Sequence, residues 1–262
     1  MHSAALHDRL LAPSAATTPA VAALFIDEFE HDAPLVSIPR PEAQLVARFG
    51  PSARNGVDVH AFGARERAHR KLIRGGQRSV TVRLRLGVSD VVLGVPATAI
   101  AGRIVPLEDL WGEVETGRLR EQLAGSGSTA EAARILDSAI AERLVVAQAS
   151  GAPARLTLVA ADMLSGASVN AVAVDLGVSE RHLRRLFREA VGMSPKTFAK
   201  LTRFHRALRV AREDGETSWA SVAAAAGYYD QAHLIAEFRA IVGVTPRALL
   251  RELAAPQAAR LP

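Results

Sequence analysis

Apolar residues follow two different periods along the chain, and the period changes near residue 107. Between about Ala23 and Leu107, apolar and polar residues alternate over short stretches, which is the pattern of β-strands with one buried face. Ser79–Leu86 is the clearest example, with valine or leucine at every second position. Further strands are predicted at Gln44–Phe49, Val57–Phe62 and Val91–Val95. Short strands at this spacing predict a small barrel or sandwich.

After residue 107 the apolar residues recur at helical spacing. The pattern predicts a helix from Leu107 to Leu123, broken at Gly112 and Gly117, and a longer one from Thr129 to Gln148 capped by Ser128. The apolar stripe of the longer helix consists of Ala133, Leu136, Ile140, Leu144 and Ala147. This stripe packs either into the core of the domain or against a second copy of the chain in a dimer. Residues 1–22 lack a period and are interpreted as a flexible arm or a frayed terminus. Residues 150–153 form a short linker.

Residues 177–195 combine an apolar stripe with a strongly basic face. Ser179 is a good N-cap, and the stripe that follows consists of Leu183, Leu186, Phe187 and Ala190. The basic face consists of Arg181, His182, Arg184, Arg185 and Arg188. Any one of these arginines is explained by a solvated surface. Five basic residues with almost no acidic partners repel one another, and the pattern therefore favours a polyanion as partner.

The basic helix belongs to a unit that occurs twice. Val169–Leu176 is a short helix capped by Ser168, and a short helix, a turn with glycine and an exposed basic helix make a helix-turn-helix. Residues 219–227 repeat 169–177 at an offset of fifty, and the offset becomes fifty-one after the turn, where Phe187 pairs with Phe238. A helix predicted over Thr197–Arg212 joins the two units and acts as a spacer, with this buried stripe: Phe198, Leu201, Phe204, Leu208 and Ala211.

The repeat resembles the DNA-binding domain of AraC/XylS-type transcription regulators. The residues that carry the resemblance are "LGVSERHLRRLFREAVGMSP" and "AAAAGYYDQAHLIAEFRAIVGVTP", within about Arg155 to Leu253. The resemblance implies two helix-turn-helix units in successive major-groove segments of one DNA face. It also implies a front domain that senses a small molecule or a partner, and helices that mediate dimerisation. "FGARERAHRK" and "VPLEDLWG" are more weakly similar to an N-terminal domain of such regulators.

Charge is concentrated in the repeat. Residues 1–154 carry 17 Lys and Arg against 17 Asp and Glu, whereas residues 179–212 carry ten against two. The chain has no cysteine, which excludes disulfides, thiolate metal sites, thiol catalysis and the alkyl-transfer enzymes that share this DNA-binding module. No apolar run is long enough for a membrane span, and Asp8 and Arg9 argue against an export signal, so a cytoplasmic, nucleoid-associated protein is expected.

No catalytic, cofactor or metal site is predicted. His60 and His69 are interpreted as surface or hydrogen-bonded histidines, and Gly75-Gly76 as a hairpin turn. Exposed positions near the start of a recognition helix reach base edges. The predicted base-reading residues are Arg181, His182, Arg184, Arg185, Tyr229, Asp230, Gln231 and Ala232. The predicted phosphate contacts are Ser179, Arg188, Lys196, Lys200, Arg203, Arg239 and Arg247. His233 is left out because it is adjacent to the turn that contains Tyr228.

These observations predict an α+β protein without enzymatic activity. A flexible arm (1–22) precedes a β-rich, cupin-like barrel or sandwich (23–125), a helix and linker that are a candidate dimerisation element (126–154), an all-α double helix-turn-helix domain (155–255) and a tail (256–262). The predicted function is sequence-specific transcription regulation, with double-stranded DNA, RNA polymerase, a small-molecule effector and a second copy of the chain as candidate partners. The alternative is a constitutive DNA-binding protein whose front half is an interaction module. An apolar pocket with a few polar groups in the strand-rich domain would separate the two.

Overall fold

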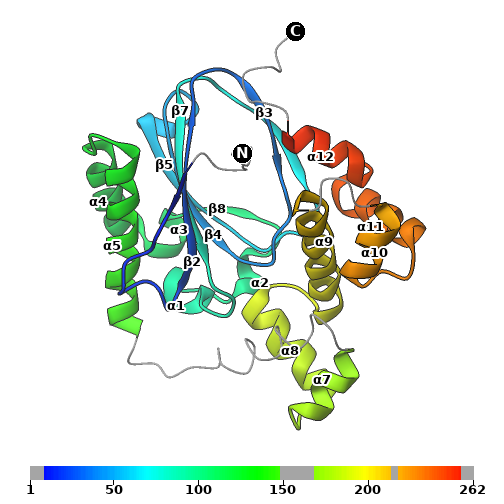
Figure 1. The fold of residues 1–262 in the computed structure, drawn as a ribbon. Coiled ribbons are helices and arrows are strands. Elements are labelled where there is room, and N and C mark those ends of the chain that lie inside the picture. The colour runs from blue at the N-terminus through cyan, green and yellow to red at the C-terminus, as the bar shows by residue number, and fades with distance from the viewer. Residues whose placement is uncertain (1–8, 148–167, 214–217, 255–262) are drawn as a thin grey trace.

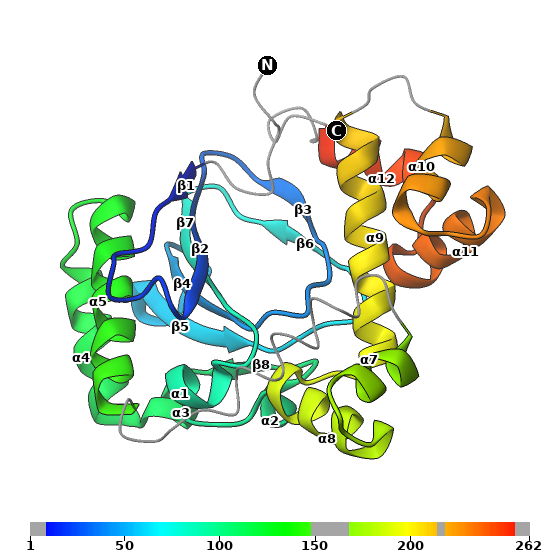
Figure 2. The ribbon, with the colours of Figure 1, turned by 60° about the horizontal axis from the view of Figure 1, so that its bottom comes forward.

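Two antiparallel sheets build the N-terminal part of the computed structural model, which describes residues 9–147, 168–213 and 218–254. The larger sheet contains, in spatial order, β1 (Arg9–Leu11), β2 (Val21–Phe29), β7 (Gln77–Leu84), β4 (Gln44–Phe49), β5 (Val57–Phe62) and β8 (Ile104–Pro106). The smaller sheet pairs β3 (Ala33–Ser37) with β6 (His69–Ile73). Figure 2 shows the smaller sheet lying opposite the larger one.

Each central strand of the larger sheet is buried on both faces. On β7, Val80, Val82 and Leu84 belong to the main apolar core, whereas Gln77, Ser79 and Thr81 face the space between the two sheets. The side chains separate in this way because successive residues of a strand point to opposite faces. The polar half of the alternation therefore faces an internal cavity, where Thr81 is only 6% exposed.

Five helices close the side of the larger sheet that faces away from the smaller sheet (Figure 1). They are α1 (Ser89–Leu93), α2 (Ala97–Ile100), α3 (Glu108–Trp111), α4 (Glu113–Ala124) and α5 (Thr129–Ala147). A short 3-10 turn, η1 (Arg54–Gly56), precedes β5. Ala133, Leu136 and Ile140 of α5 are each at most 1% exposed and lie in the main core. This part of the predicted stripe is therefore core and not a dimer seam.

The C-terminal part is helical. It contains α7 (Val169–Asp175), α8 (Glu180–Val191), α9 (Pro195–Glu213), α10 (Trp219–Ala226), α11 (Gln231–Val242) and α12 (Pro246–Ala254). Helix α9 runs between the α7–α8 pair and the α10–α11 pair (Figure 1). Four positions of its predicted buried stripe are confirmed as buried, namely Phe198, Leu201, Phe204 and Leu208. The fifth, Ala211, is only partly buried.

The two parts share one apolar core. Val36, Ile38 and Ala64 of the N-terminal part are buried in the same cluster as the stripe of α9. Polar contacts reinforce this packing, because Ala68 N donates to Ile241 O at 3.0 Å and His205 Nε2 donates to Pro39 O at 2.8 Å. No pattern along the chain predicted this interface.

Three local predictions are wrong. Residues 91–95 do not form a strand, since Ser89–Leu93 is helix α1 and its apolar side chains pack under the larger sheet. Gly117 does not break its helix and lies within α4, although the break at Gly112 is confirmed. Gly75-Gly76 is a turn that connects the two sheets and not a hairpin, because β6 pairs with β3. Asp32 holds this turn by accepting a hydrogen bond from Gly75 N at 2.8 Å.

The expected arm is in large part folded. Within the described residues, β1 pairs with β2, and Thr17 is fully buried with its hydroxyl donating to Asp137 of α5. The linker at 150–153, the start of the DNA-binding domain at 155 and the tail at 256–262 lie outside the described residues. In the part of the chain that the structure describes, no helix is both long and apolar enough to cross a membrane.

Candidate DNA-binding interface

Polar caps define both helices of each helix-turn-helix unit. Ser168 and Ser179 accept hydrogen bonds from Ala171 N and His182 N, which confirms them as the N-caps of α7 and α8. Ser218 caps α10 in the same way. The turn between α7 and α8 passes through Gly177 at φ +65°, a conformation that favours glycine. Local sequence therefore sets the start of each helix.

Helix α8 presents an arginine stripe on its exposed side. Arg181, Arg184, Arg185 and Arg188 are exposed and recur at helical spacing, whereas Leu183, Phe187 and Val191 are buried. The four arginines line one open groove together with Glu180, Glu189 and Thr98. Thr98 lies on α2, and it has no signal in the sequence that would place it beside a recognition helix.

Two of the arginines are held by neighbours on the same helix. Arg184 Nη2 lies 2.5 Å from Glu180 Oε2, and Arg185 Nη2 lies 3.2 Å from His182 Nδ1. Both contacts are solvent-exposed, and exposed ion pairs contribute about 0–1 kcal/mol. DNA can therefore displace them at small cost. His182 is half-buried, so its contribution to the groove is smaller than that of the arginines.

Helix α11 offers a different and mostly uncharged surface. Gln231 and Ala232 are exposed in its first turn, and Tyr229 is 93% exposed just before it. Asp230 is the N-cap, with its carboxylate accepting from His233 N at 2.7 Å. One oxygen of Asp230 is therefore already used to cap the helix, and its predicted base contact stays a prediction. The repeat contains the signal for the cap, since Asp230 aligns with Ser179 at the offset of fifty-one.

His233 packs against Tyr228, as its position beside the turn suggested. The two rings are 5.2 Å apart between centroids and meet edge to face. Burial and the neighbouring Glu237 carboxylate raise the pKa of the Tyr228 hydroxyl well above its ordinary value. Tyr228 therefore belongs to the core under α11 and stays protonated.

Arg203 was predicted to contact phosphate, but its side chain packs against residues 228 and 237 of the same domain. Its Nη2 donates to Glu237 Oε2 at 2.9 Å, and its guanidinium lies 5.5 Å from the centroid of the Tyr228 ring. Glu237 is 8% exposed, so its carboxylate is largely shielded from water, whereas Arg203 is partly exposed. We therefore assign Arg203 to the attachment of α11 to α9.

The other predicted phosphate contacts lie at or near the surface. Arg188, Lys196, Arg239 and Arg247 are exposed, and Lys200 is half-buried. Ser179 is exposed, although its hydroxyl already caps α8. These positions are compatible with the predicted contacts, which stay predictions.

Two aromatic pairs attach both recognition helices to α9. Phe198 meets Phe187 of α8 with ring centroids 5.1 Å apart, and Phe204 meets Phe238 of α11 at 4.6 Å. Aromatic pairs at such distances contribute about 0.5–1.5 kcal/mol beyond their burial. Because both anchors lie on one continuous helix, α9 fixes the position of one recognition helix relative to the other.

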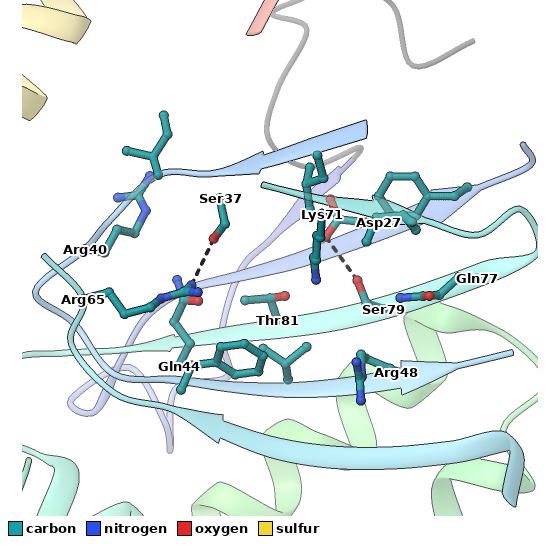
Figure 3. Close-up of a pocket in the computed structure, with 16 residues that line it drawn as sticks. Asp27, Ser37, Arg40, Gln44, Arg48, Arg65, Lys71, Gln77, Ser79 and Thr81 are labelled. Carbon is teal, nitrogen blue, oxygen red and sulfur yellow. Dashed lines mark hydrogen bonds between the residues drawn. The ribbon is translucent and has the colours of Figure 1, made fainter. Parts of the chain in front are cut away.

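A second concave site lies between the two sheets of the N-terminal part (Figure 3). It has a volume of about 80 Å³. Strands β2, β4 and β7 contribute to one wall, and β3 and β6 to the opposite wall. The lining is both apolar and charged: Asp27, Phe29, Leu35, Ser37, Ile38, Arg40, Gln44, Val46, Arg48, Phe62, Arg65, Lys71, Ile73, Gln77, Ser79 and Thr81.

Neither histidine that was considered for a metal site lines this cavity. His60 Nδ1 lies 3.2 Å from Asp58 Oδ1, and His69 is exposed on β6. Both placements fit the interpretation as hydrogen-bonded or surface residues.

Residues 172–252 match the family model described as "Helix-turn-helix domain". A transcriptional regulator with an AraC-type DNA-binding domain from Chromobacterium violaceum is 24% identical over 38% of this chain and 94% of its own, with a TM-score of 0.35. ToxT from Vibrio cholerae is 9% identical over 88% of this chain and 98% of its own, with a TM-score of 0.45. The C-terminal domain of AraT from Geobacillus stearothermophilus is 21% identical over 40% of this chain and 91% of its own, with a TM-score of 0.36. No curated protein matches the chain.

Proposed function

We propose that the chain is a DNA-binding transcription regulator that reads two successive major-groove segments of one duplex. Residues 172–252, which match the helix-turn-helix family model, supply the two recognition helices. The observation that carries this proposal is the pair of capped recognition helices attached to the single helix α9. At about 1.5 Å per residue, the 19 residues of α9 span about 28 Å. Such a spacer, together with the width of the two units, suits recognition helices about one DNA turn, or about 34 Å, apart.

The two units differ in what they contribute. Helix α8 supplies four exposed arginines, and arginine makes two hydrogen bonds to guanine O6 and N7. Helix α11 supplies Gln231, which suits adenine, and Ala232, which suits a thymine methyl group. We therefore expect α8 to provide most of the affinity and α11 to set the register.

Selection of binding sites from random duplexes tests this arrangement. The expected outcome is two conserved blocks whose centres lie about 10–10.5 base pairs apart, with guanine prominent in only one of them. Replacing Arg184 and Arg185 by alanine should relax the guanine-rich block, and Gln231→Ala should relax the other. A single conserved block in the sites selected by the full chain would contradict the two-unit proposal.

For the N-terminal part, the cavity favours effector sensing over a simple interaction module. It combines apolar walls with converging polar groups, which is typical of small-molecule sites. Its lining also includes Ile38, which is buried in the apolar core around α9. A ligand in the cavity therefore contacts a segment that packs on the DNA-binding part.

The outer surface of α4 and α5 supports dimerisation. Val114, Val145 and Val146 are 71–79% exposed there, and none of them belongs to the buried α5 stripe. Sedimentation of the full chain over a range of concentrations tests this, because a dimer dissociates on dilution.

A further inference from the structure

We propose that the cavity between the two sheets binds a small organic monocarboxylate with a compact apolar body, and that Lys71 and Arg65 provide its counter-charge. The inference deepens the proposed effector sensing by naming the chemical class of the ligand. It depends on the charges that line the cavity, on the neutral partners of those charges and on the apolar remainder of the wall.

Positive charge exceeds negative charge in the cavity wall. Four cationic side chains line it, namely Arg40, Arg48, Arg65 and Lys71, against the single carboxylate of Asp27. Of these side chains, Figure 3 shows Arg65 and Lys71 extending into the space between the two sheets. An anion in this space would lie within reach of several cationic groups.

Two of the cations already have carboxylates outside the cavity. Arg48 makes a bidentate pair with Asp58, with Nε and Nη2 each 2.8 Å from a carboxylate oxygen. Burial and then repulsion by Arg83 lower the pKa of the Arg40 guanidinium, whereas Glu42 attracts it. Of the remaining charges, Asp27 attracts Lys71 and accepts a hydrogen bond from Ser79 Oγ at 3.3 Å. The wall as a whole therefore keeps an excess of positive charge, which favours an anionic ligand.

Arg65 has a neutral hydrogen-bond partner, the hydroxyl group of Ser37. Its Nη2 donates to Ser37 Oγ at 3.0 Å, and burial lowers the pKa of its guanidinium. Asp27 compensates Lys71 only in part, because burial and the neighbouring Arg48 and Arg65 together lower the pKa of its ammonium group. Buried cations are costly unless an opposite charge compensates them. A bound carboxylate would relieve both the desolvation and the mutual repulsion.

The rest of the wall favours an apolar body of limited size. Phe29, Leu35, Val46, Phe62 and Ile73 provide apolar surface from both sheets. A cavity needs about 10–15 Å³ of such volume to hold one water molecule. The cavity volume of about 80 Å³ therefore has room for roughly five to eight groups of that size. Pivalate, a branched monocarboxylate with seven non-hydrogen atoms, is a suitable probe. Pivalamide has the same shape without the charge.

The test is calorimetric titration of the full chain with pivalate, pivalamide and inorganic phosphate at one ionic strength. We expect saturable binding of pivalate, with pivalamide and phosphate each at least tenfold weaker. Lys71→Met and Arg65→Met should each weaken pivalate binding about tenfold or more, because each removes one counter-charge. Arg118→Met, which removes an exposed guanidinium group on α4, should leave it unchanged.

Equal binding of pivalate and pivalamide would overturn the charge argument, and equal binding of phosphate would overturn the apolar-body argument. Absence of pivalate binding, or wild-type binding by both Lys71→Met and Arg65→Met, would overturn the proposal as a whole. Thermal melting of both variants verifies that they are folded. Affinity of the ligand-free chain for selected DNA is measured separately, so that a failure of the DNA-binding proposal is distinguishable from a failure at the cavity.

Discussion

At the scale of single residues, exposure and hydrogen-bond partners separate groups that the sequence treats alike. Arg184 and Arg203 are both basic residues near a recognition helix, and both were expected to contact DNA. Arg184 is exposed and its ion pair with Glu180 lies in solvent, whereas Arg203 is paired with the buried Glu237. Pairing across α9 and α11 cannot be read from spacing along the chain, because it depends on how the two helices pack.

The first prediction ranks the base-reading residues. Arg184→Ala and Arg185→Ala should each cost about 1–3 kcal/mol on the specific site, because each removes a candidate two-bond contact to guanine. Non-specific binding should change much less, since phosphate contacts dominate it. Gln231→Ala should cost less on the specific site than either arginine variant. Titration of each variant against specific and scrambled duplexes at one salt concentration measures both quantities, and a larger loss for Gln231→Ala would reverse the ranking.

The second prediction tests the structural assignment of Arg203. Arg203→Gln leaves Glu237 buried without its cation, which costs up to about 3–5 kcal/mol for a fully buried pair, so the melting temperature should fall. The slope of log K against log[salt] should stay that of the wild type.

Arg188→Gln is the matched control for Arg203→Gln. It should leave the melting temperature nearly unchanged and make the salt slope shallower by about 0.9, the expected effect of losing one phosphate contact. A shallower slope for Arg203→Gln with unchanged stability would restore Arg203 to the phosphate set.

At the scale of elements, prediction from sequence succeeded where one local signal decides the structure. Strands β4 and β5 have the predicted bounds, and Ser168 and Ser179 cap the predicted helices. It failed where packing decides. The predicted strand at 91–95 begins with two β-branched valines, yet residues 91–93 form the end of a short helix against the main core. The polar residues of β7 looked like a solvent face, but the smaller sheet covers them and makes them a cavity wall.

The third prediction concerns the basic surface formed by α8 and the helix after it. If about six of the ten basic residues in 179–212 contact phosphate, log K against log[salt] should have a slope of about −5. The assignment of Arg203 to the core leaves enough exposed cations for this number. Measurement of affinity between low and moderate salt gives the slope, and a value shallower than about −2 would show that most of the surface is solvated and does not bind DNA.

At the scale of the whole molecule, the two parts are connected more closely than the sequence predicted. Val36, Ile38 and Ala64 complete an apolar core that otherwise belongs to the helical part. Arg70 adds a charged contact, donating to Val242 O at 2.8 Å and lying 3.0 Å from Glu252. Ile38 therefore lies both in this shared core and in the wall of the cavity.

The fourth prediction follows from this shared core. The fragment 155–262 should fold alone and melt cooperatively, since both units and α9 provide a common interior. It should melt at a lower temperature than this part does in the full chain, because removal of Val36, Ile38 and Ala64 exposes apolar surface at about 25 cal/mol per Å². Calorimetry of the fragment and the full chain measures the difference. A fragment without a cooperative transition would show that the helical part requires the N-terminal part to fold.

The last prediction uses His205, which connects α9 to the N-terminal part. Burial, and then repulsion by Arg40, lower the pKa of its imidazole from 6.5 to about 4, and its neutral ring donates from Nε2 to Pro39 O. A group with a lowered pKa binds fewer protons in the folded state than in the unfolded state between these two values.

Stability of the full chain should therefore fall as the pH drops from about 6.5 to about 4, by at most about 3 kcal/mol, since one pKa unit corresponds to about 1.4 kcal/mol. Asp58, whose pKa is lowered from 3.8 to about 2, contributes only at lower pH. His205→Gln is the matched control, because glutamine has an N–H that can replace the bond to Pro39 O and does not titrate. Thermal melting across this pH range should show a smaller loss for His205→Gln than for the wild type, and parallel curves would mean that His205 does not control the acid sensitivity of the interface.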